Sequence, residues 1–398
     1  MKKDILAKKL ENSIAIYEAE GVFVGRIWVP EQKGPSPVAI IAGDIYDFSK
    51  LTATSSQLLN QAHPLDFILK FYRSKWVDCL GPLEDVMMNC HPDLRNLARP
   101  LLLSPCDLQA IRACGVTFVS SMLERVIDEF ARGRSSKAGD LRGSIMEEVG
   151  ETLSTIRPGS LSSERLKDSL IKRGLWSQYL EVGIGPFAEV FNKAQPMASV
   201  GTGSEIGIRS DSRWNNPEPE LVLVLNRAGT IIGTTIGNDV NLRDFEGRSA
   251  LLLGKAKDNN ASCSIGPLIR LLDESYTISD AYRTKLEITV HGQDRYDLSG
   301  TSDFAQISRD PAELVRQAIN RTNQYPDGIL LFLGTQFAPT SDRNEIGKGF
   351  THKVGDIVSI SCQKLGTLTN RVNLCEKIAP WTFGVGDLMS NLSKRGLI

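Results

Sequence analysis

Histidine is scarce in this chain. The 398 residues include only four histidines, and no two of them stand at the spacing of metal ligands. They are His63, His91, His291 and His352. Catalysis by this chain is therefore expected to rely on carboxylate, lysine and metal rather than on a histidine triad.

Cysteine pairs are also missing. The seven cysteines are scattered, without a Cys-x-x-Cys motif, at Cys79, Cys90, Cys106, Cys114, Cys263, Cys362 and Cys375. Their odd number and wide spacing argue against a disulfide framework and against a zinc site. We expect reduced, mostly buried thiols in a cytoplasmic protein.

Long apolar runs and an excess of one charge are absent too. No window reaches the roughly 18 consecutive apolar residues of a membrane span. The formal net charge of −1 gives no reason to expect nucleic acid or an anionic membrane as a partner. Residues 1–12 alternate charged and apolar side chains without a signal-peptide core, which predicts a short amphipathic helix.

The length of the chain predicts two domains, because 398 residues exceed one ordinary core. Residues 1–103 are expected to form a small α+β N-terminal domain. Residues 104–398 are expected to form a catalytic domain that is α+β but mainly β. A charged segment at about 120–174 is expected to be a helical cover over this domain.

The pattern of apolar residues and turn formers predicts individual elements. Strands are expected within 21–51, with a hairpin turn at Ala42-Gly-Asp44, and helices at 52–72 and 82–98. Further along the chain, strands are expected at 205–210, 220–225, 230–236, 285–291, 329–334 and 356–361, and helices at 245–257 and 311–320.

Three acidic residues, Glu218, Glu220 and Asp239, dominate the chemistry of the sequence. Strand side chains repeat with a period of two, so Glu218 and Glu220 project from the same face. A strand, a turn and a second strand then return the chain to Asp239. Glu-x-Glu on a strand is usually a solvated face, but here an apolar run follows directly. Three convergent carboxylates suit a hard divalent cation such as Mg²⁺.

A set of short motifs carries a family resemblance. The motifs are Glu218-x-Glu220, Gly237-Asn-Asp239-Val-x-x-Arg243-Asp244, Gly334-Thr335 and the strand pair around Gly355-Asp356 and Gly366-Thr367. Together they resemble the fumarylacetoacetate hydrolase superfamily over roughly residues 104–398. The resemblance implies a fumarylacetoacetate hydrolase-like mixed β-sandwich roll with a metal bound by the acidic triad.

Two longer blocks are similar to the 2-keto-3-deoxy-pentonate dehydratases of that superfamily. They are Trp214-Asn-Asn-Pro-Glu-Pro-Glu220 and Lys255-Ala-Lys-Asp-Asn-Asn-Ala-Ser-Cys263. This resemblance implies a Mg²⁺-dependent lyase of non-phosphorylating pentose catabolism. It would act on a 2-keto-3-deoxy sugar acid of the D-xylonate or D-arabinonate type and yield 2,5-dioxopentanoate. It also implies a homodimer or homotetramer, and Mn²⁺ stays open because it takes the same ligands.

One departure from the hydrolytic branch favours elimination. Hydrolases of the superfamily commonly place a water-activating histidine where this chain has Ser121. A serine without a base partner does not act as a general base at neutral pH. The expected reaction forms a metal-stabilised enolate by loss of a C3 proton and then expels the C4 hydroxyl.

The resemblance also implies roles for residues around the triad. Lys257 is expected to hold the keto oxygen or to move protons if desolvation lowers its pKa. Arg243 is expected to orient the ligands or bind the substrate carboxylate, and Thr335 to bind that carboxylate. Glu124 is the candidate for proton transfer, and Ser121 for a hydrogen bond to a substrate hydroxyl. For each, an ordinary structural role is the alternative.

Two other functions remain open on the sequence alone. One is a hydrolase of acylpyruvate or other 2,4-diketo acids from the same superfamily. The other is a non-catalytic, metal-dependent keto-acid-binding protein.

Overall fold

The structure is a computed structural model that describes residues 4–18, 21–132, 134, 137, 156–343, 345 and 348–398. Its larger sheet has eleven strands among the described residues, and β5 pairs only with β1 at its side. In sheet order the strands are β4 (Asp78–Pro82), β3 (Asp44–Asp47), β2 (Gly34–Ile41), β1 (Val22–Val29), β13 (Cys263–Leu271), β11 (Ile231–Asp239), β10 (Pro219–Leu225), β16 (Ile329–Phe332), β6 (Ala110–Gly115) and β7 (Glu189–Ala194), with β5 (Leu101–Leu102).

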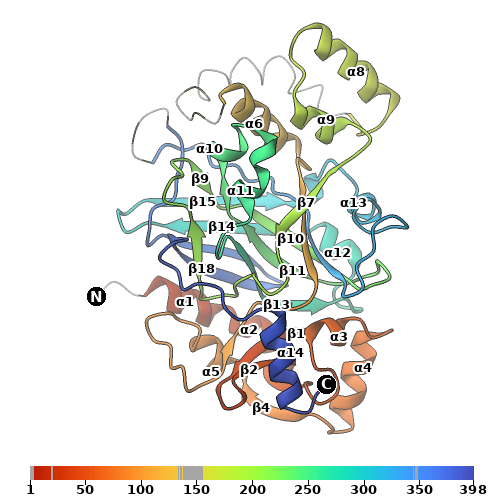
Figure 1. Cartoon of the computed structure of the whole chain (residues 1–398), viewed down its shortest axis with the longest axis vertical. Helices are drawn as coiled ribbons and strands as arrows, with labels where there is room; N and C mark the ends of the chain where they lie inside the picture. Colours follow the sequence, from red (N-terminus) through yellow and green to blue (C-terminus); the bar gives the residue numbers. More distant parts are fainter. Residues whose placement is uncertain are drawn as a thin grey trace.

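A second sheet of five strands lies against the larger one (Figure 1). Its order is β15 (Asp297–Asp303), β14 (Lys285–His291), β17 (Ile357–Cys362), β18 (Gly366–Leu374) and β8 (Glu205–Ile208). Both sheets are mixed, because β6 runs parallel to β16 and β8 runs parallel to β18. Two short strands, β9 (Asn215–Asn216) and β12 (Asn241–Leu242), pair near the end of β11.

Helices lie at both the upper and the lower end of this arrangement (Figure 1). They are α1 (Ile5–Asn12), α2 (Ile14–Glu18), α3 (Ser55–Leu59), α4 (Pro64–Arg73), α5 (Leu83–Met88), α6 (Val119–Phe130), α8 (Leu161–Lys172), α9 (Gln178–Ile184), α10 (Arg243–Glu246), α11 (Leu253–Lys257), α12 (Ile278–Tyr282), α13 (Pro311–Ala318) and α14 (Val385–Lys394). Three 3-10 turns add η1 (Pro30–Gln32), η2 (Ala250–Leu252) and η3 (Phe304–Gln306). None of the described helices is long and apolar enough to cross a membrane.

Strand β10 explains how the core is divided. Every residue of β10 is buried. Leu221, Leu223 and Leu225 join the core between the two sheets, where Ile288 and Ile360 of the second sheet also lie. Val222 and Val224 belong to the core on the opposite face. A central strand covered on both faces reads as a continuous apolar run, which is what the sequence shows.

The N-terminal strands are joined to the rest through backbone pairing. Strand β1 pairs antiparallel with β13, so β1–β4 extend the larger sheet. The predicted hairpin is confirmed, because Ile41 of β2 pairs with Asp44 of β3. The predicted amphipathic N-terminal helix is confirmed as α1, which Asp4 caps. The proposed division of the chain near residue 103 stays a prediction.

Three predicted helices differ from the structure. Residues 52–72 form two helices, α3 and α4, with a break between Leu59 and Pro64. Residues 82–98 contain only α5, since the side chain of Asn89 bonds the loop carbonyls of Asn96, Arg99 and Pro100. The predicted helix 245–257 is wrong as one element, because α10, η2 and α11 replace it. The break falls at Gly247, where α10 ends, before the apolar run 250–253. Part of the predicted cover, residues 138–155, lies outside the described residues.

Candidate active site

The three acidic residues predicted as metal ligands converge. Glu218, Glu220 and Asp239 each place a carboxylate oxygen within 4.8 Å of the others, and all three are buried. Strand pairing explains the convergence. The amide of Asp239 donates to the carbonyl of Glu218 at 3.0 Å, directly before β10 pairs with β11. The hairpin thus returns Asp239 to the first pair, as predicted.

The three carboxyl groups of the triad differ in the direction of their pKa shifts. Burial raises the pKa of Glu220 well above its ordinary value, and the charges of Asp239 and Glu218 raise it further. Burial also raises the pKa of Glu218, although Lys257 and Arg125 oppose this. The pKa of Asp239 is lowered, because Lys193 and Lys257 outweigh the effect of burial.

Two buried lysines form ion pairs with the triad. The Nζ of Lys257 lies 2.6 Å from Glu218 and 3.1 Å from Asp239. The Nζ of Lys193 lies 2.9 Å from Asp239 and also donates to the carbonyl of Lys257. Burial lowers the pKa of Lys257, but Asp239 and Glu218 outweigh it and raise this pKa above its ordinary value. The condition set for Lys257 to move protons, a lowered pKa, is therefore not met.

Strand β7 brings a set of residues that the sequence reading missed. Glu189, Phe191 and Lys193 alternate along it and so share one face. The pairing of β6 with β7 shifts between Ile111 and Arg112, which leaves Lys193 in a β-bulge. Such a bulge re-aims a side chain, here toward Asp239. The period-two pattern of these residues was the signal available in the sequence.

Helix α6 presents a polar stripe to the site. Ser121, Glu124, Arg125 and Asp128 are buried and recur at helical spacing on one face. Arg125 contacts Glu218 and lies 3.0 Å from Asp128 and 3.1 Å from Glu246. Arg125 and Asp128 were missed, although they fall on the same helical spacing as Ser121 and Glu124.

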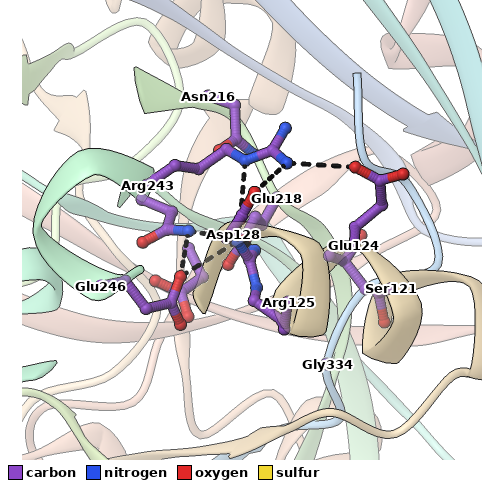
Figure 2. Close-up of polar contacts among 12 residues, drawn as sticks. Ser121, Glu124, Arg125, Asp128, Asn216, Glu218, Arg243, Glu246 and Gly334 are labelled. Atoms are coloured by element: carbon purple, nitrogen blue, oxygen red, sulfur yellow. Dashed lines mark hydrogen bonds and ion pairs between the residues drawn. The ribbon is translucent and has the colours of Figure 1, made fainter. Parts of the chain in front are cut away.

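Arg243 ties α10 to α6 (Figure 2). Its guanidinium lies 2.7 Å from Asp128 and 3.2 Å from Glu124, and it stacks over the ring of Trp214 at 4.2 Å. Neither Arg243 nor Glu124 lines the cavity at the triad. This geometry fits the orienting role foreseen for Arg243 more closely than direct contact with a substrate.

A small cavity of about 30 Å³ opens at the triad. Beyond the triad itself, its lining includes Ser121, Arg125, Glu189, Glu246, Lys257 and Thr335, and no histidine among the described residues. The hydroxyl of Ser121 donates to the carbonyl of Phe118 at 3.2 Å, and that of Thr335 accepts from the amide of Phe337 at 3.1 Å. A cavity of this size holds about one water molecule, so side chains must shift when a larger ligand enters.

The donor set fits a divalent cation. Five carboxyl groups line the cavity, and within the described residues the cations that reach them are Arg125, Lys257 and Lys193. The cluster thus carries a formal excess of two negative charges. Convergent carboxylates with this excess match a hard cation of charge +2 held by oxygen ligands.

Gly334 fixes the position of Glu220, which makes it a test of the site. Its amide donates to the Glu220 carboxylate at 2.6 Å, and its φ is +83°. A Cβ there would clash with the hydroxyl of Thr117 and lie 3.0 Å from the carbonyl of Cys114. Gly334→Ala should therefore destabilise the protein by about 1–3 kcal/mol and weaken Mg²⁺ binding.

Chemical denaturation and calorimetric titration with Mg²⁺ measure these two effects. Gly386→Ala in α14 is the matched control, because its Cβ meets open space. Unchanged stability and Mg²⁺ affinity in Gly334→Ala would contradict the assigned role of this amide.

Comparison with known proteins finds similarity in the part of the chain that carries the acidic triad. Residues 184–373 match the family model described as Fumarylacetoacetate (FAA) hydrolase C-terminal. Over 190 residues the chain is 37% identical to the 2-dehydro-3-deoxy-D-arabinonate dehydratase of Saccharolobus solfataricus, covering 48% of this chain and 60% of that protein. Over 194 residues it is 34% identical to a probable 2-keto-3-deoxyxylonate dehydratase of Haloferax volcanii, covering 49% and 63%.

The aligned part of the chain spans less than two thirds of the length of these curated relatives. The fold extends further. A solved structure of a 2-keto-3-deoxy-D-arabinonate dehydratase complexed with magnesium and 2,5-dioxopentanoate covers 89% of this chain, with a TM-score of 0.58 and 23% identity. The predicted resemblance is confirmed: residues 184–373 match the fumarylacetoacetate hydrolase C-terminal family model, and the chain shares the fold of that dehydratase structure.

Proposed function

We propose that this chain is a Mg²⁺-dependent dehydratase that converts a 2-keto-3-deoxy-pentonate to 2,5-dioxopentanoate in non-phosphorylating pentose catabolism. The observation that carries the proposal is the buried triad with Lys257 bridging Glu218 and Asp239. The names of the two curated relatives, and the ligands of the structural neighbour, support this substrate class. The proposal includes a cytoplasmic location and a homodimer or homotetramer, as the resemblance implies.

The residues divide the chemical task between them. When bound, Mg²⁺ supplies Lewis-acid charge that favours the loss of a C3 proton from a 2-keto acid. Glu218, Glu220 and Asp239 are its carboxylate ligands. Lys257 is held as an ammonium between two of them, so it stabilises the negative charge that develops on the C2 oxygen.

The remaining cavity residues orient the substrate. Arg125 offers a planar guanidinium, which suits the bidentate binding of a carboxylate. The hydroxyls of Ser121 and Thr335 face the same cavity. Ser121 accepts from a substrate hydroxyl, and Thr335 donates to the substrate carboxylate. Arg243 positions α6 through Asp128. Proton transfer by Glu124 stays a prediction. Its carboxylate pairs with Arg243 and does not line the cavity.

Elimination is favoured over hydrolysis by what lines the cavity. A hydrolase of 2,4-diketo acids needs a group that activates water. No histidine lines the cavity in the described part of the chain, and the Ser121 hydroxyl is engaged by a backbone carbonyl. A single substrate-derived proton suffices for dehydration, so the reaction needs no activated water.

A panel of 2-keto-3-deoxy acids tests the proposal. The purified chain, stripped with EDTA, should form the semialdehyde only after Mg²⁺ is added back. Chelation should lower the rate by about 100-fold or more, because Lewis-acid stabilisation contributes several kcal/mol. Pyruvate from a diketo acid, without semialdehyde, would instead support the hydrolase. Saturable binding without any product would support the binding protein.

A further inference from the structure

Asn241 links two carboxylates of the cavity through one amide group. It lies on β12, two residues after Asp239, and it is fully buried. Its Nδ2 donates to Oε1 of Glu218 at 3.1 Å and to Oε2 of Glu246 at 2.6 Å. Both hydrogens of this amide are therefore engaged by acids of the site.

A second donor reaches the same oxygen of Glu218. Nη2 of Arg125 contacts Oε1 of Glu218, and its Nη1 lies 3.1 Å from Oε2 of Glu246. A carboxylate oxygen has two lone pairs, so Asn241 and Arg125 together occupy both of those on Oε1. Oε2 of Glu218 accepts from Lys257 at 2.6 Å and keeps one lone pair for a cation.

The other two ligands of the triad are held by fewer donors. Oε2 of Glu220 accepts from the amide of Gly334 at 2.6 Å, and Oδ1 of Asp239 lies 2.9 Å from Nζ of Lys193. Each of these oxygens thus meets one donor, whereas Oε1 of Glu218 meets two. Glu218 is therefore the ligand whose second oxygen is withheld from a cation.

Resting on the metal site of the proposed function, we infer that Asn241 is a positioning residue that makes this site selective for Mg²⁺ over Ca²⁺. Mg²⁺ requires a near-octahedral shell at about 2.1 Å, whereas Ca²⁺ takes about six to eight oxygens at about 2.4 Å and often binds both oxygens of one carboxylate. The two oxygens of a carboxylate are too close together to fill neighbouring corners of the small Mg²⁺ octahedron. Withholding Oε1 therefore costs Ca²⁺ a ligand and costs Mg²⁺ none.

The neutral amide separates this effect from simple charge attraction. Removing Asn241 leaves the formal charge of the cluster unchanged, so the attraction for any divalent cation stays the same. Removing Arg125 would add a negative charge and alter the affinity for both ions. Asn241 is thus the position at which the number of available oxygens changes alone.

Asn241→Leu tests the assignment, because leucine keeps the size of the side chain and removes the amide. Calorimetric titrations of the EDTA-treated protein with MgCl₂ and with CaCl₂ give two dissociation constants. Their ratio, Ca²⁺ over Mg²⁺, should fall about tenfold in the variant, since contacts around a metal ligand change affinity by about 10- to 100-fold. Arg125 still reaches Glu218 and Glu246, so the variant should fold. Asn241→Val repeats the test with a side chain that favours strands.

Asn216→Leu is the matched control. Asn216 pairs with Asn241 between β9 and β12 and is also buried, but its amide donates to the carbonyl of Pro217. Its ratio should match that of wild type, and a fall as large as in Asn241→Leu would overturn the assignment.

An unchanged ratio in both Asn241 variants also overturns the assignment, including when both ions bind more weakly, because a purely structural asparagine affects the two ions alike. The titrations need no turnover. A wild-type chain that forms no semialdehyde would overturn the proposed reaction, while the ratio still decides the role of Asn241. A wild-type chain that binds no Mg²⁺ would overturn both.

Discussion

Glu220→Gln should abolish turnover without destabilising the metal-free protein. Glu220 is buried beside Asp239 and Glu218. Burial and these two charges raise its pKa well above the ordinary value, which favours the protonated form when no cation is bound. Glutamine reproduces that neutral form and can still accept from the amide of Gly334. In EDTA, the free energy of unfolding should therefore stay within about 1 kcal/mol of wild type.

The metal-dependent behaviour of Glu220→Gln should be lost. Wild-type protein gains about 2.7 kcal/mol of stability at a Mg²⁺ concentration 100 times its dissociation constant, because only the folded state binds. The variant should show no such gain, and its residual rate should be at least about 10²-fold below that of wild type. Denaturation with and without Mg²⁺ measures the gain in stability, and the semialdehyde assay measures the rate. Glu164→Gln, an exposed acid on α8, is the control, and a full Mg²⁺ response in Glu220→Gln would remove Glu220 from the ligand set.

Lys193→Met should destabilise the fold strongly. Lys193 is fully buried. Its ammonium forms an ion pair with Asp239 and donates hydrogen bonds to the backbone carbonyls of Lys257 and Val240. Removing one partner of a buried ion pair costs about 3–5 kcal/mol. Lys257 still lies 3.1 Å from Asp239 in the variant, so we expect a loss near the lower end of this range. Chemical denaturation in EDTA should show this loss in the free energy of unfolding.

Mg²⁺ should restore part of the stability of Lys193→Met, because a bound cation also neutralises Asp239. Lys255→Met gives the matched control, since Lys255 is exposed and lies two residues from Lys257 on the same helix. A loss below about 1 kcal/mol in Lys193→Met would show that Asp239 does not depend on this lysine.

Much of the fold was predictable because local pattern and tertiary burial agree. The strands at β10, β11, β14, β16 and β17 carry apolar runs or alternations that the structure retains. The metal triad was predictable for the same reason: a period of two pairs Glu218 with Glu220, and one hairpin returns Asp239. Each of these steps spans only a short stretch of chain.

The break between α10 and α11 was not predictable from local pattern. Gly247 ends α10, and a Cβ there would lie 2.9 Å from the carbonyl oxygen of Asp128 on α6. The constraint comes from a helix distant in the sequence. An apolar run such as Ala250-Leu-Leu-Leu253 gives no sign of that contact.

The second half of the site was missed because it depends on distant pairing. Glu189 and Lys193 reach the triad only because β7 pairs with β6, which in turn pairs with β16. Arg125 reaches Glu218 from α6, which is distant from the triad in the sequence. Their types and spacings were visible, but nothing local distinguished them from solvated charges.

The pairing of β1 with β13 has a consequence for how the protein is made. Residues 22–29 leave the ribosome long before residues 263–271. During synthesis, the edge of β1 that pairs with β13 therefore has no partner strand. Helix α14, which donates from Asn391 to Gln32 and from Arg395 to Pro35, arrives later still. Non-local pairing of this kind slows folding and exposes strand edges, so chaperone demand should peak mid-translation.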